Sequence, residues 1–426
     1  MNKTFFRIIV IILIAILSGV GYLILRSEQT GKTPNEVFVD TTRNIFPFSQ
    51  NGQNGENTGT LPDSTTGDNG EESPSSINIQ NLTKIYSKPV AGAGFYQKEE
   101  AILGLDENGL ETTILETKDF VRFVEQETGH VYDLDLSTGI TTRVSGTTIP
   151  RVYEAYIGHE DYVALRYLDD NGNIKTYIGK ITEVEGGAGS LEGEFLVDNI
   201  SSFSISKDGS KYFYIYKIGT ESVGISSNFD GTNQKQSFSS PFSEWLGQVL
   251  AVGTSTVSIT SKASGLASGY SYKINENTKI MEKIIGGVSG LTSLVSENGK
   301  LALISTYFNN KLELSVVNEN GTVTNTGLKT LPEKCVWSKD STVAWCSVPQ
   351  NVSLGPIYPD AWYKGQISWS DNIWKFDINT GLYILNENLS KTSGSQIDGV
   401  NLKLNEEENN LLFINKKDQS LWLLKI

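Results

Sequence analysis

The sequence predicts an all-β protein whose main part is a β-propeller, and three observations support this fold class. Five stretches repeat an apolar strand, a tight polar turn and a second apolar strand. Their turns recur roughly every 42 to 48 residues, with one doubled and one longer interval, a spacing typical of propeller blades. No run after residue 81 combines helical periodicity with capping residues. The five stretches are YIGHEDYVALRY (156–167), SISKDGSKYFYIY (204–216), LVSENGKLALIS (294–305), VWSKDSTVAWCS (336–347) and LKLNEEENNLLFIN (402–415).

An apolar segment occupies residues 8–25, near the N-terminus. At ~1.5 Å per residue, this segment is long enough to cross the hydrocarbon core of a membrane. Lys3 and Arg7 precede it, so the positive-inside rule places the N-terminus in the cytoplasm, although Arg26 follows it. A cleaved signal peptide is the alternative, and it also exports the remainder. We therefore expect a cytoplasmic tip and signal anchor at residues 1–26 of a single-pass membrane protein whose C-terminal domain lies outside the cytoplasm, in the bacterial cell envelope or at the surface.

An acidic linker rich in Gly, Asn, Ser and Thr follows at residues 27–80. Between residues 49 and 76 it has almost no apolar side chains, so burial cannot offset the entropy of ordering it. A flexible chain of about fifty residues reaches roughly 40 Å. We expect this linker to tether the folded part to the membrane.

Residues 81–426 form the expected propeller domain, outside the cytoplasm, with turn signals that divide it into seven units of four strands. The last unit holds three strands and would leave an open edge. We therefore predict that LTKIYS (82–87) completes the last blade and closes the ring. Six or eight blades stay open as alternatives, because residues 183–193 and 348–371 interrupt the spacing. The units are 88–146, 147–192, 193–240, 241–285, 286–329, 330–390 and 391–426.

The two cysteines flank one hairpin turn. Cys335 and Cys346 fall opposite each other if the turn is centred between Asp340 and Ser341. An exported chain with two cysteines in this arrangement is expected to form a structural disulfide.

Charge and motifs argue against several functions. The net charge of −14 disfavours a nucleic-acid partner, which requires a basic surface. The chain has two histidines, His130 and His159, and lacks a G-x-S-x-G nucleophile motif, a phosphate-binding glycine motif and a metal-ligand spacing. We therefore name no catalytic residue, no metal ligand and no cofactor, and we regard an enzymatic activity as the weaker alternative.

The most distinctive stretch is WCSVPQNVSLGPIYPDAWYKGQISWSDNIW (345–374), which replaces a short connection between the second and third strands of the sixth unit. Such connections lie on the face of a propeller where ligands commonly bind, and long loops with aromatic and charged residues suit a binding surface. The alternative is that the aromatic side chains fold inward and fill the channel or cover a blade. The candidate binding residues are Tyr358, Asp360, Trp362, Tyr363, Lys364, Trp369 and Asp371.

The segments SKDGSKYFYI, SENGKLALIS and WSKDSTVAWC are similar to degenerate forms of a W-S-x-D-G strand-turn-strand signature. In this respect the chain resembles membrane-anchored, exported bacterial β-propellers of the TolB-like and WD-repeat-like kind, and an uncharacterised subfamily among them. The resemblance covers residues 82–426 at the level of fold. It implies contact with other proteins in the cell envelope.

These observations lead to one main functional hypothesis and two alternatives. We expect a membrane-tethered extracytoplasmic propeller that serves as a protein-binding or scaffold module, with an envelope or surface protein as its partner. One alternative is a propeller that binds a glycan or small ligand. If it also cleaves that ligand, it is a hydrolase or a lyase. The other is a self-assembling surface protein.

Overall fold

The computed structural model describes residues 75–105, 111–184, 187–250 and 255–426. The expected signal anchor and nearly all of the expected linker lie outside these residues and stay predictions. Within the described part of the chain, no helix is long and apolar enough to cross a membrane.

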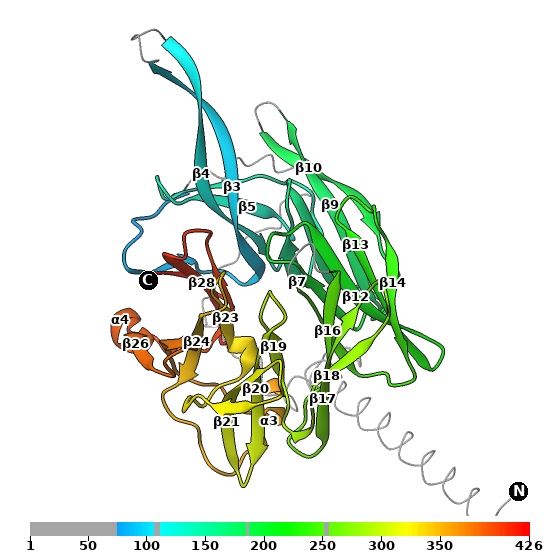
Figure 1. Ribbon diagram of the computed structural model, residues 1–426. Coiled ribbons are helices and arrows are strands. Elements are labelled where there is room, and N and C mark those ends of the chain that lie inside the picture. The colour runs from blue at the N-terminus through cyan, green and yellow to red at the C-terminus, as the bar shows by residue number, and fades with distance from the viewer. Residues whose placement is uncertain (1–74, 106–110, 185–186, 251–254) are drawn as a thin grey trace, which may run out of the picture. The chain divides into compact units, whose positions relative to one another are not determined.

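The described residues form seven antiparallel sheets, each built almost entirely from consecutive strands, and the predicted seven-bladed propeller is confirmed (Figure 1). The first three blades extend from the N-terminal side. Blade 1 contains β3 (Val90–Leu105), β4 (Glu111–Glu125), β5 (Val131–Asp135) and β6 (Ile140–Arg143). Blade 2 contains β7 (Val152–Ile157), β8 (Tyr162–Leu168), β9 (Ile174–Val184) and β10 (Gly187–Phe195). Blade 3 contains β11 (Ser202–Ile205), β12 (Lys211–Ile218), β13 (Glu221–Asn228) and β14 (Lys235–Ser240).

The next three blades follow the same order. Blade 4 contains β15 (Trp245–Val249), β16 (Thr256–Ser261), β17 (Ser268–Asn275) and β18 (Met281–Ser289). Blade 5 contains β19 (Ser293–Val295), β20 (Leu301–Phe308), β21 (Lys311–Asn318) and β22 (Val323–Asn325). Blade 6 follows the 3-10 helix η1 (Pro332–Lys334) and contains β23 (Cys335–Trp337), β24 (Val343–Pro349), β25 (Asp371–Asp377) and β26 (Tyr383–Glu387).

Blade 7 closes the ring with strands from both ends of the domain. After the helix α4 (Leu389–Ser393), β27 (Gly399–Leu404), β28 (Asn410–Asn415) and β29 (Leu421–Lys425) supply three strands. The fourth is β2 (Leu82–Tyr86), which pairs antiparallel with β29 and places Leu82 opposite Leu424. The predicted closure by residues 82–87 is therefore confirmed. One further short strand, β1 (Ser75–Ser76), pairs with β6 at the outer edge of blade 1.

The first strand of each blade lies toward the centre of the ring, as shown by contacts between β3 and β7, β11 and β15, and β23 and β27. The loops that join second to third strands therefore share one end of the ring with the loops that join successive blades. Figure 1 shows that β3 and β4 extend as a two-stranded ribbon beyond the rest of their sheet. The repeat pattern of the sequence does not predict this extension.

Apolar side chains fill the spaces between neighbouring blades, because each sheet must bury both of its faces. Phe123 of blade 1 packs in one cluster with Leu412 and Leu423 of blade 7. Val124 of blade 1 packs in another with Val163 and Leu165 of blade 2. The hydrophobic core is thus distributed between the blades.

Buried ions also connect adjacent blades. Arg122 of β4 binds both carboxylate oxygens of Asp133 at 2.7 and 2.8 Å, and its third nitrogen binds Asp161 of blade 2 at 2.8 Å. The ring of Tyr96 lies 3.9 Å from the guanidinium carbon, and its hydroxyl donates to Asp161 at 2.8 Å. We call these four residues the Arg122 cluster. All three guanidinium nitrogens of Arg122 and the Tyr96 hydroxyl have a carboxylate partner, which offsets the cost of burying the charge.

The predicted disulfide is present. Cys335 and Cys346 are directly opposite each other in β23 and β24, with a Cα–Cα distance of 4.1 Å. The bond joins the innermost strand of blade 6 to its neighbour.

Candidate functional site

Residues 350–370, which we call the crossing segment, connect β24 to β25 and pass over two other blades. The carboxylate of Asp360 accepts hydrogen bonds from the Ser264 hydroxyl at 3.0 Å and the Gly265 amide at 2.7 Å, both in the β16–β17 loop of blade 4. On the way, the Tyr307 hydroxyl of blade 5 donates to the Pro356 carbonyl at 3.0 Å. A side chain at Gly265 would clash with the backbone of Tyr358, so the loop and the segment approach each other closely.

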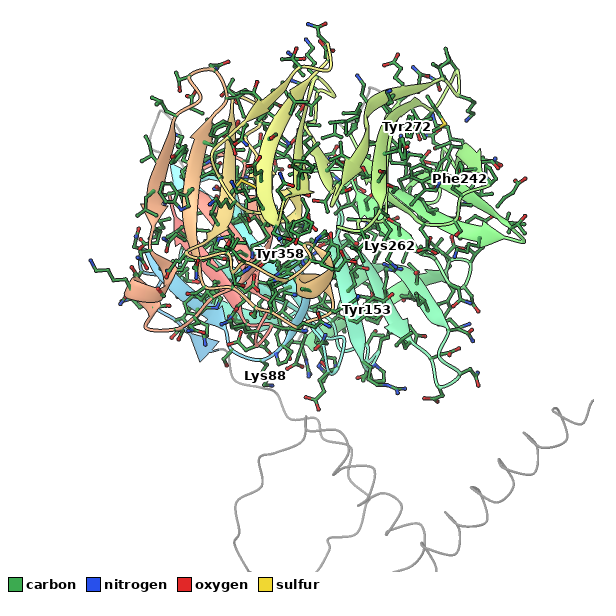
Figure 2. All side chains as sticks on the ribbon, turned by 90° about the horizontal axis from the view of Figure 1, so that it is seen from below. Lys88, Tyr153, Phe242, Lys262, Tyr272 and Tyr358 are labelled. Atoms are coloured by element: carbon green, nitrogen blue, oxygen red, sulfur yellow. A yellow bond between two sulfur atoms is a disulfide. The ribbon has the colours of Figure 1, made fainter. Side chains whose placement is uncertain are left out.

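Three aromatic rings form the buried side of the crossing segment. Trp369 stacks with Tyr358 at 5.8 Å and with Trp362 at 5.5 Å between ring centroids. All three rings are buried. In Figure 2, Tyr358 lies near the middle of the view, whereas the exposed Phe242 lies toward its edge. The rings therefore anchor the segment from the inside, as the alternative interpretation of the sequence proposed for the aromatic residues.

A buried ion cluster lies against these rings. The ammonium group of Lys334, at the end of η1, binds Asp371 at 2.8 Å and also pairs with Asp398. It lies 5.2 Å from the ring centroid of Trp362 and 5.3 Å from that of Trp369. All three charged side chains are fully buried. We call Lys334, Asp371 and Asp398 the Lys334 cluster.

The two carboxylates of this cluster differ in electrostatic environment. Burial raises the pKa of Asp371 despite the attraction of Lys334, and Asp398 adds repulsion. Burial also acts on Asp398, but Lys334 together with hydrogen bonds from the Trp369 amide and the Trp362 indole lowers its pKa. Asp398 is thus favoured in its ionised form, and through the two tryptophans it holds the crossing segment against blade 7.

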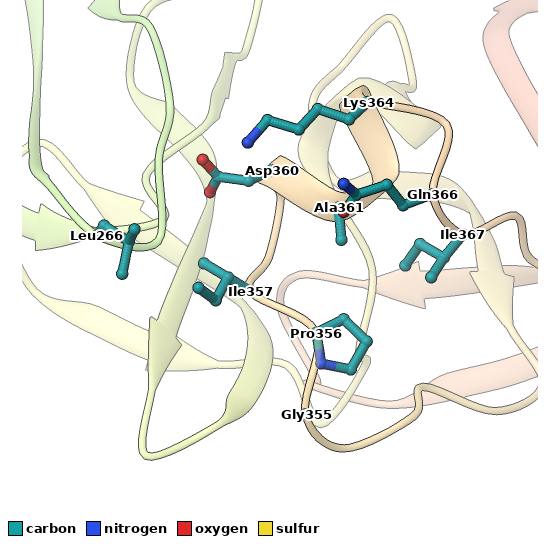
Figure 3. A pocket seen from close by; sticks show the side chains of 9 residues that line it. All are labelled: Leu266, Gly355, Pro356, Ile357, Asp360, Ala361, Lys364, Gln366 and Ile367. Carbon is teal, nitrogen blue, oxygen red and sulfur yellow. The ribbon is translucent and has the colours of Figure 1, made fainter. Parts of the chain in front are cut away.

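The outer side of the crossing segment forms a pocket of about 340 Å³ with the loop of blade 4. Figure 3 shows Asp360 and Lys364 at its rim, with Asp360 directed toward the loop that carries Leu266. The ammonium group of Lys364 forms no ion pair within the described part of the chain. Leu266 has 77% of its surface exposed. The lining residues are Leu266, Gly355, Pro356, Ile357, Asp360, Ala361, Lys364, Gln366 and Ile367.

The predicted binding residues thus fall into two groups. Asp360 and Lys364 line the pocket, and Tyr363 lies exposed beside them with its hydroxyl donating to Glu333. The other four are buried beneath the segment or at its end, where they support it. These four residues are Tyr358, Trp362, Trp369 and Asp371.

Sequence reasoning missed the residues that other blades contribute to this region. Lys334 and Asp398 precede inner strands, and nothing in their local sequence distinguishes them from solvated turn residues. Leu266 had a usable signal, since it is an apolar residue in the glycine- and serine-rich loop ASGLASG (263–269). That loop joins second to third strands, so it had to share a face with the crossing segment.

The two histidines do not contribute to this site. His130 lies in blade 1, where its Nε2 is 3.0 Å from the Thr148 hydroxyl, and His159 is exposed in a turn of blade 2. Among the described residues, no group of three His, Cys, Asp or Glu side chains is arranged to hold a metal ion.

The order of the strands in the seven sheets defines a seven-bladed β-propeller. No family model and no curated protein matches the sequence. The solved structures similar to it include oligogalacturonate lyase from Vibrio parahaemolyticus, with a TM-score of 0.49 and 12% identity over 80% of this chain and 98% of that one.

Two other solved structures are similar to a comparable degree. TolB from Acinetobacter baumannii has a TM-score of 0.41 and 9% identity, over 78% of this chain and 80% of its own. Virginiamycin B lyase from Staphylococcus aureus has a TM-score of 0.45 and 11% identity, over 78% of this chain and 100% of its own.

Proposed function

We propose that this chain is a membrane-tethered, extracytoplasmic propeller that binds a protein of the cell envelope through the pocket beside the crossing segment. The observation that carries the proposal is the composition of this pocket. Apolar side chains form its walls, and charged side chains stand at its rim. Protein interfaces commonly combine a buried apolar contact with a charged, hydrated margin.

The pocket suits an apolar side chain of a partner protein. Leu266, Ile357 and Ile367 offer apolar surface from two different blades. The carboxylate of Asp360 is already occupied by the blade 4 loop, so it stabilises the shape of the pocket. Lys364 supplies a cation at the rim, which favours a partner with an acidic group next to the inserted side chain.

The crossing segment is held rigidly enough to act as a preformed surface. Its buried rings, the Lys334 cluster and the contact of Asp360 with blade 4 fix both of its sides. A preformed surface loses little conformational entropy on binding, which favours affinity.

Photo-crosslinking in intact cells tests this function. A benzophenone amino acid is placed at Leu266 and, as the matched control, at Ile280, an exposed apolar residue near the β17–β18 turn at the other end of blade 4. We expect position 266 to yield a dominant protein adduct that position 280 does not yield. Mass spectrometry identifies the adduct.

Other outcomes contradict the proposal in different ways. Equal adducts at both positions mean that this pocket has no special role. Absence of any protein adduct at position 266, with the variant folded, favours the glycan or small-ligand alternative. In that case the binding of oligosaccharides to the purified chain is measured directly. Lys364→Ala should then lower the affinity for an anionic sugar.

The membrane tether is tested separately. We expect protease added to intact cells or spheroplasts to cut within residues 27–80 and to release a stable fragment that contains the propeller. The compact strand-rich domain resists cleavage, whereas the acidic polar linker has little apolar surface to bury. Protection of the whole chain until the membrane is disrupted would contradict the proposed orientation.

A further inference from the structure

The outer strand of blade 6 has an unusual surface. β26 is the last strand in the sheet order β23-β24-β25-β26, so no strand of the described residues pairs with its outer side. Four consecutive apolar residues occupy the position before β26 and its first three positions. Leu382, Tyr383, Ile384 and Leu385 have 65%, 48%, 64% and 44% of their surfaces exposed. Figure 1 places β26 at the outside of the ring beside α4.

The outer strands of the other blades are protected. An exposed sheet edge invites pairing with another strand, and proteins prevent this with charged residues, short strands or a covering segment. In blade 1, β1 covers β6, and in blade 5, β22 has three residues. The remaining outer strands carry charged residues, namely Glu192 and Glu194 in β10, Lys235 in β14, Glu282 and Lys283 in β18, and Lys84 in β2. In blade 6, β26 carries its one charged residue, Glu387, at its last position, so residues 382–386 have no charged side chain.

The backbone of β26 is oriented for pairing. The Asp377 amide donates to the Leu382 carbonyl at 2.8 Å, so the backbone groups of Leu382 face β25. Because these groups alternate along an antiparallel strand, those of Tyr383 and Leu385 face outward. They are available to another strand.

We propose that two copies of this chain pair through β26 in an antiparallel arrangement with a two-fold axis at Ile384. Tyr383 of one copy then exchanges backbone hydrogen bonds with Leu385 of the other, and the two Ile384 side chains face each other. Aromatic–aliphatic and aliphatic pairs of this kind stabilise adjacent strands. The same patch serves both copies, as a two-fold interface requires.

Charge favours a second copy as the occupant. Each chain carries a net charge of −14, which opposes self-association through most of its surface. Residues 382–386 carry no charged side chain, so pairing here places no like charges opposite each other. A different protein that binds this acidic chain through charge attraction would carry basic residues. Residues 382–386 offer no acidic side chain for such a partner to contact. The apolar edge is the surface at which two identical acidic chains can meet at low electrostatic cost.

Cysteine crosslinking of the full chain in cells tests this arrangement. Ile384→Cys places the two sulfurs across a pair that is not hydrogen-bonded, where the side chains are closest. The control is Val323→Cys in β22, the short outer strand of blade 5, whose residue is also exposed. The native cysteines are buried in their disulfide and do not interfere. Under mild oxidation, we expect at least about tenfold more homodimer from Ile384→Cys than from Val323→Cys.

A second measurement keeps the test independent of disulfide formation. Ile384→Lys places the lysines of the two copies opposite each other at the two-fold axis. We expect this variant to weaken self-association of the purified full chain by about tenfold in sedimentation experiments. Val323→Lys should leave it unchanged. The proposal is overturned if Ile384→Cys crosslinks no better than Val323→Cys, or if it crosslinks to a different protein, since the edge then serves a heterologous partner.

Discussion

The Arg122 cluster and the Lys334 cluster both join neighbouring blades, but they bury their charges to different depths. In the Arg122 cluster, the Asp161 side chain has 33% of its surface exposed, and water reaches that carboxylate. In the Lys334 cluster, the cation and both carboxylates are fully buried. The first cluster can lose its cation and rehydrate part of its negative charge, whereas the second cannot.

The two clusters also differ in what they support. The Arg122 cluster only joins two blades, whereas the Lys334 cluster joins blades and supports the candidate site. Arg122 pairs bidentately with Asp133 of its own blade, and its third nitrogen binds Asp161 and so holds blade 1 to blade 2. The Lys334 cluster also contacts two tryptophans of the crossing segment. A change at Lys334 should therefore affect both stability and the pocket, while a change at Arg122 should affect stability alone.

The largest expected effect follows from removing Lys334. Lys334→Met leaves Asp371 and Asp398 buried without a cation, and breaking a buried ion pair from one side costs about 3–5 kcal/mol. We expect a loss of this size in the free energy of unfolding, measured by denaturant titration. Because the crossing segment rests on this cluster, crosslinking from Leu266 should also decrease.

A matched variant isolates the cause of that loss. Lys334→Met combined with Asp371→Asn and Asp398→Asn removes all three charges, so it should recover part of the stability. Lys300→Met, at an exposed lysine, should cost little. If the triple variant is no more stable than Lys334→Met, the loss comes from packing and the comparison between the clusters fails.

Removing Arg122 should cost less. Arg122→Met also strands two carboxylates, but Asp161 is partly hydrated, so we expect a loss of about 2–3 kcal/mol. Burial tends to raise the pKa of Asp161, whereas hydrogen bonds from Arg122 and Tyr96 outweigh it and lower the pKa. In the wild-type chain this contribution is present above the unfolded pKa of Asp161 and is lost as pH falls through the folded value. The pH dependence of unfolding below about pH 4 should therefore weaken in Arg122→Met.

The disulfide provides the next test, because it lies next to one cluster and far from the other along the ring. Cys335 follows Lys334 directly, and Cys346 precedes Ser347, whose hydroxyl donates to Asp371 at 2.8 Å. We expect replacement of both cysteines by alanine to cost about 2–3 kcal/mol through lost loop closure. A double-mutant cycle should show coupling with Lys334→Met and additivity with Arg122→Met. Equal coupling to both would contradict a local role for the bond.

Much of the fold could be predicted because it depends on local patterns. Alternating apolar residues and turn signals identify each hairpin, and an open edge in the last unit requires a strand from the front of the chain. The register across one short turn was enough to pair Cys335 with Cys346. The long β3–β4 ribbon escaped prediction, since nothing in a hairpin pattern states how far it extends beyond its sheet.

The candidate site was predictable only in part. The position of the crossing segment on the loop face followed from the order of strands in a blade. The contact of this segment with blade 4 could not be predicted, because Asp360 accepts a hydrogen bond from Gly265 across a sequence separation of 95 residues. The division of its aromatic residues into a buried and an exposed side depends on the same distant contacts. The signal anchor, the linker and the envelope partner stay predictions.

The smallest expected effect concerns a third cation, which differs from those of both clusters. Lys403, in the innermost strand of blade 7, is partly buried and forms no ion pair or hydrogen bond within the described part of the chain, and burial alone lowers its pKa to about 8. The folded state thus holds this proton less tightly than the unfolded state does. Between about pH 8 and pH 10.5, Lys403 should therefore make the wild-type chain more stable as pH rises.

Replacing Lys403 by Met should remove this dependence. We expect Lys403→Met to increase the free energy of unfolding at pH 7 by about 1 kcal/mol, less than the full pKa shift implies because water reaches part of the side chain. The gain should shrink as pH rises from 8 through 10.5, because above that range the wild-type lysine has lost its proton in both states. Lys300→Met serves again as the exposed control. A loss of stability in Lys403→Met at pH 7 would mean that this cation has a partner in the native protein, and the contrast with Arg122 and Lys334 would then disappear.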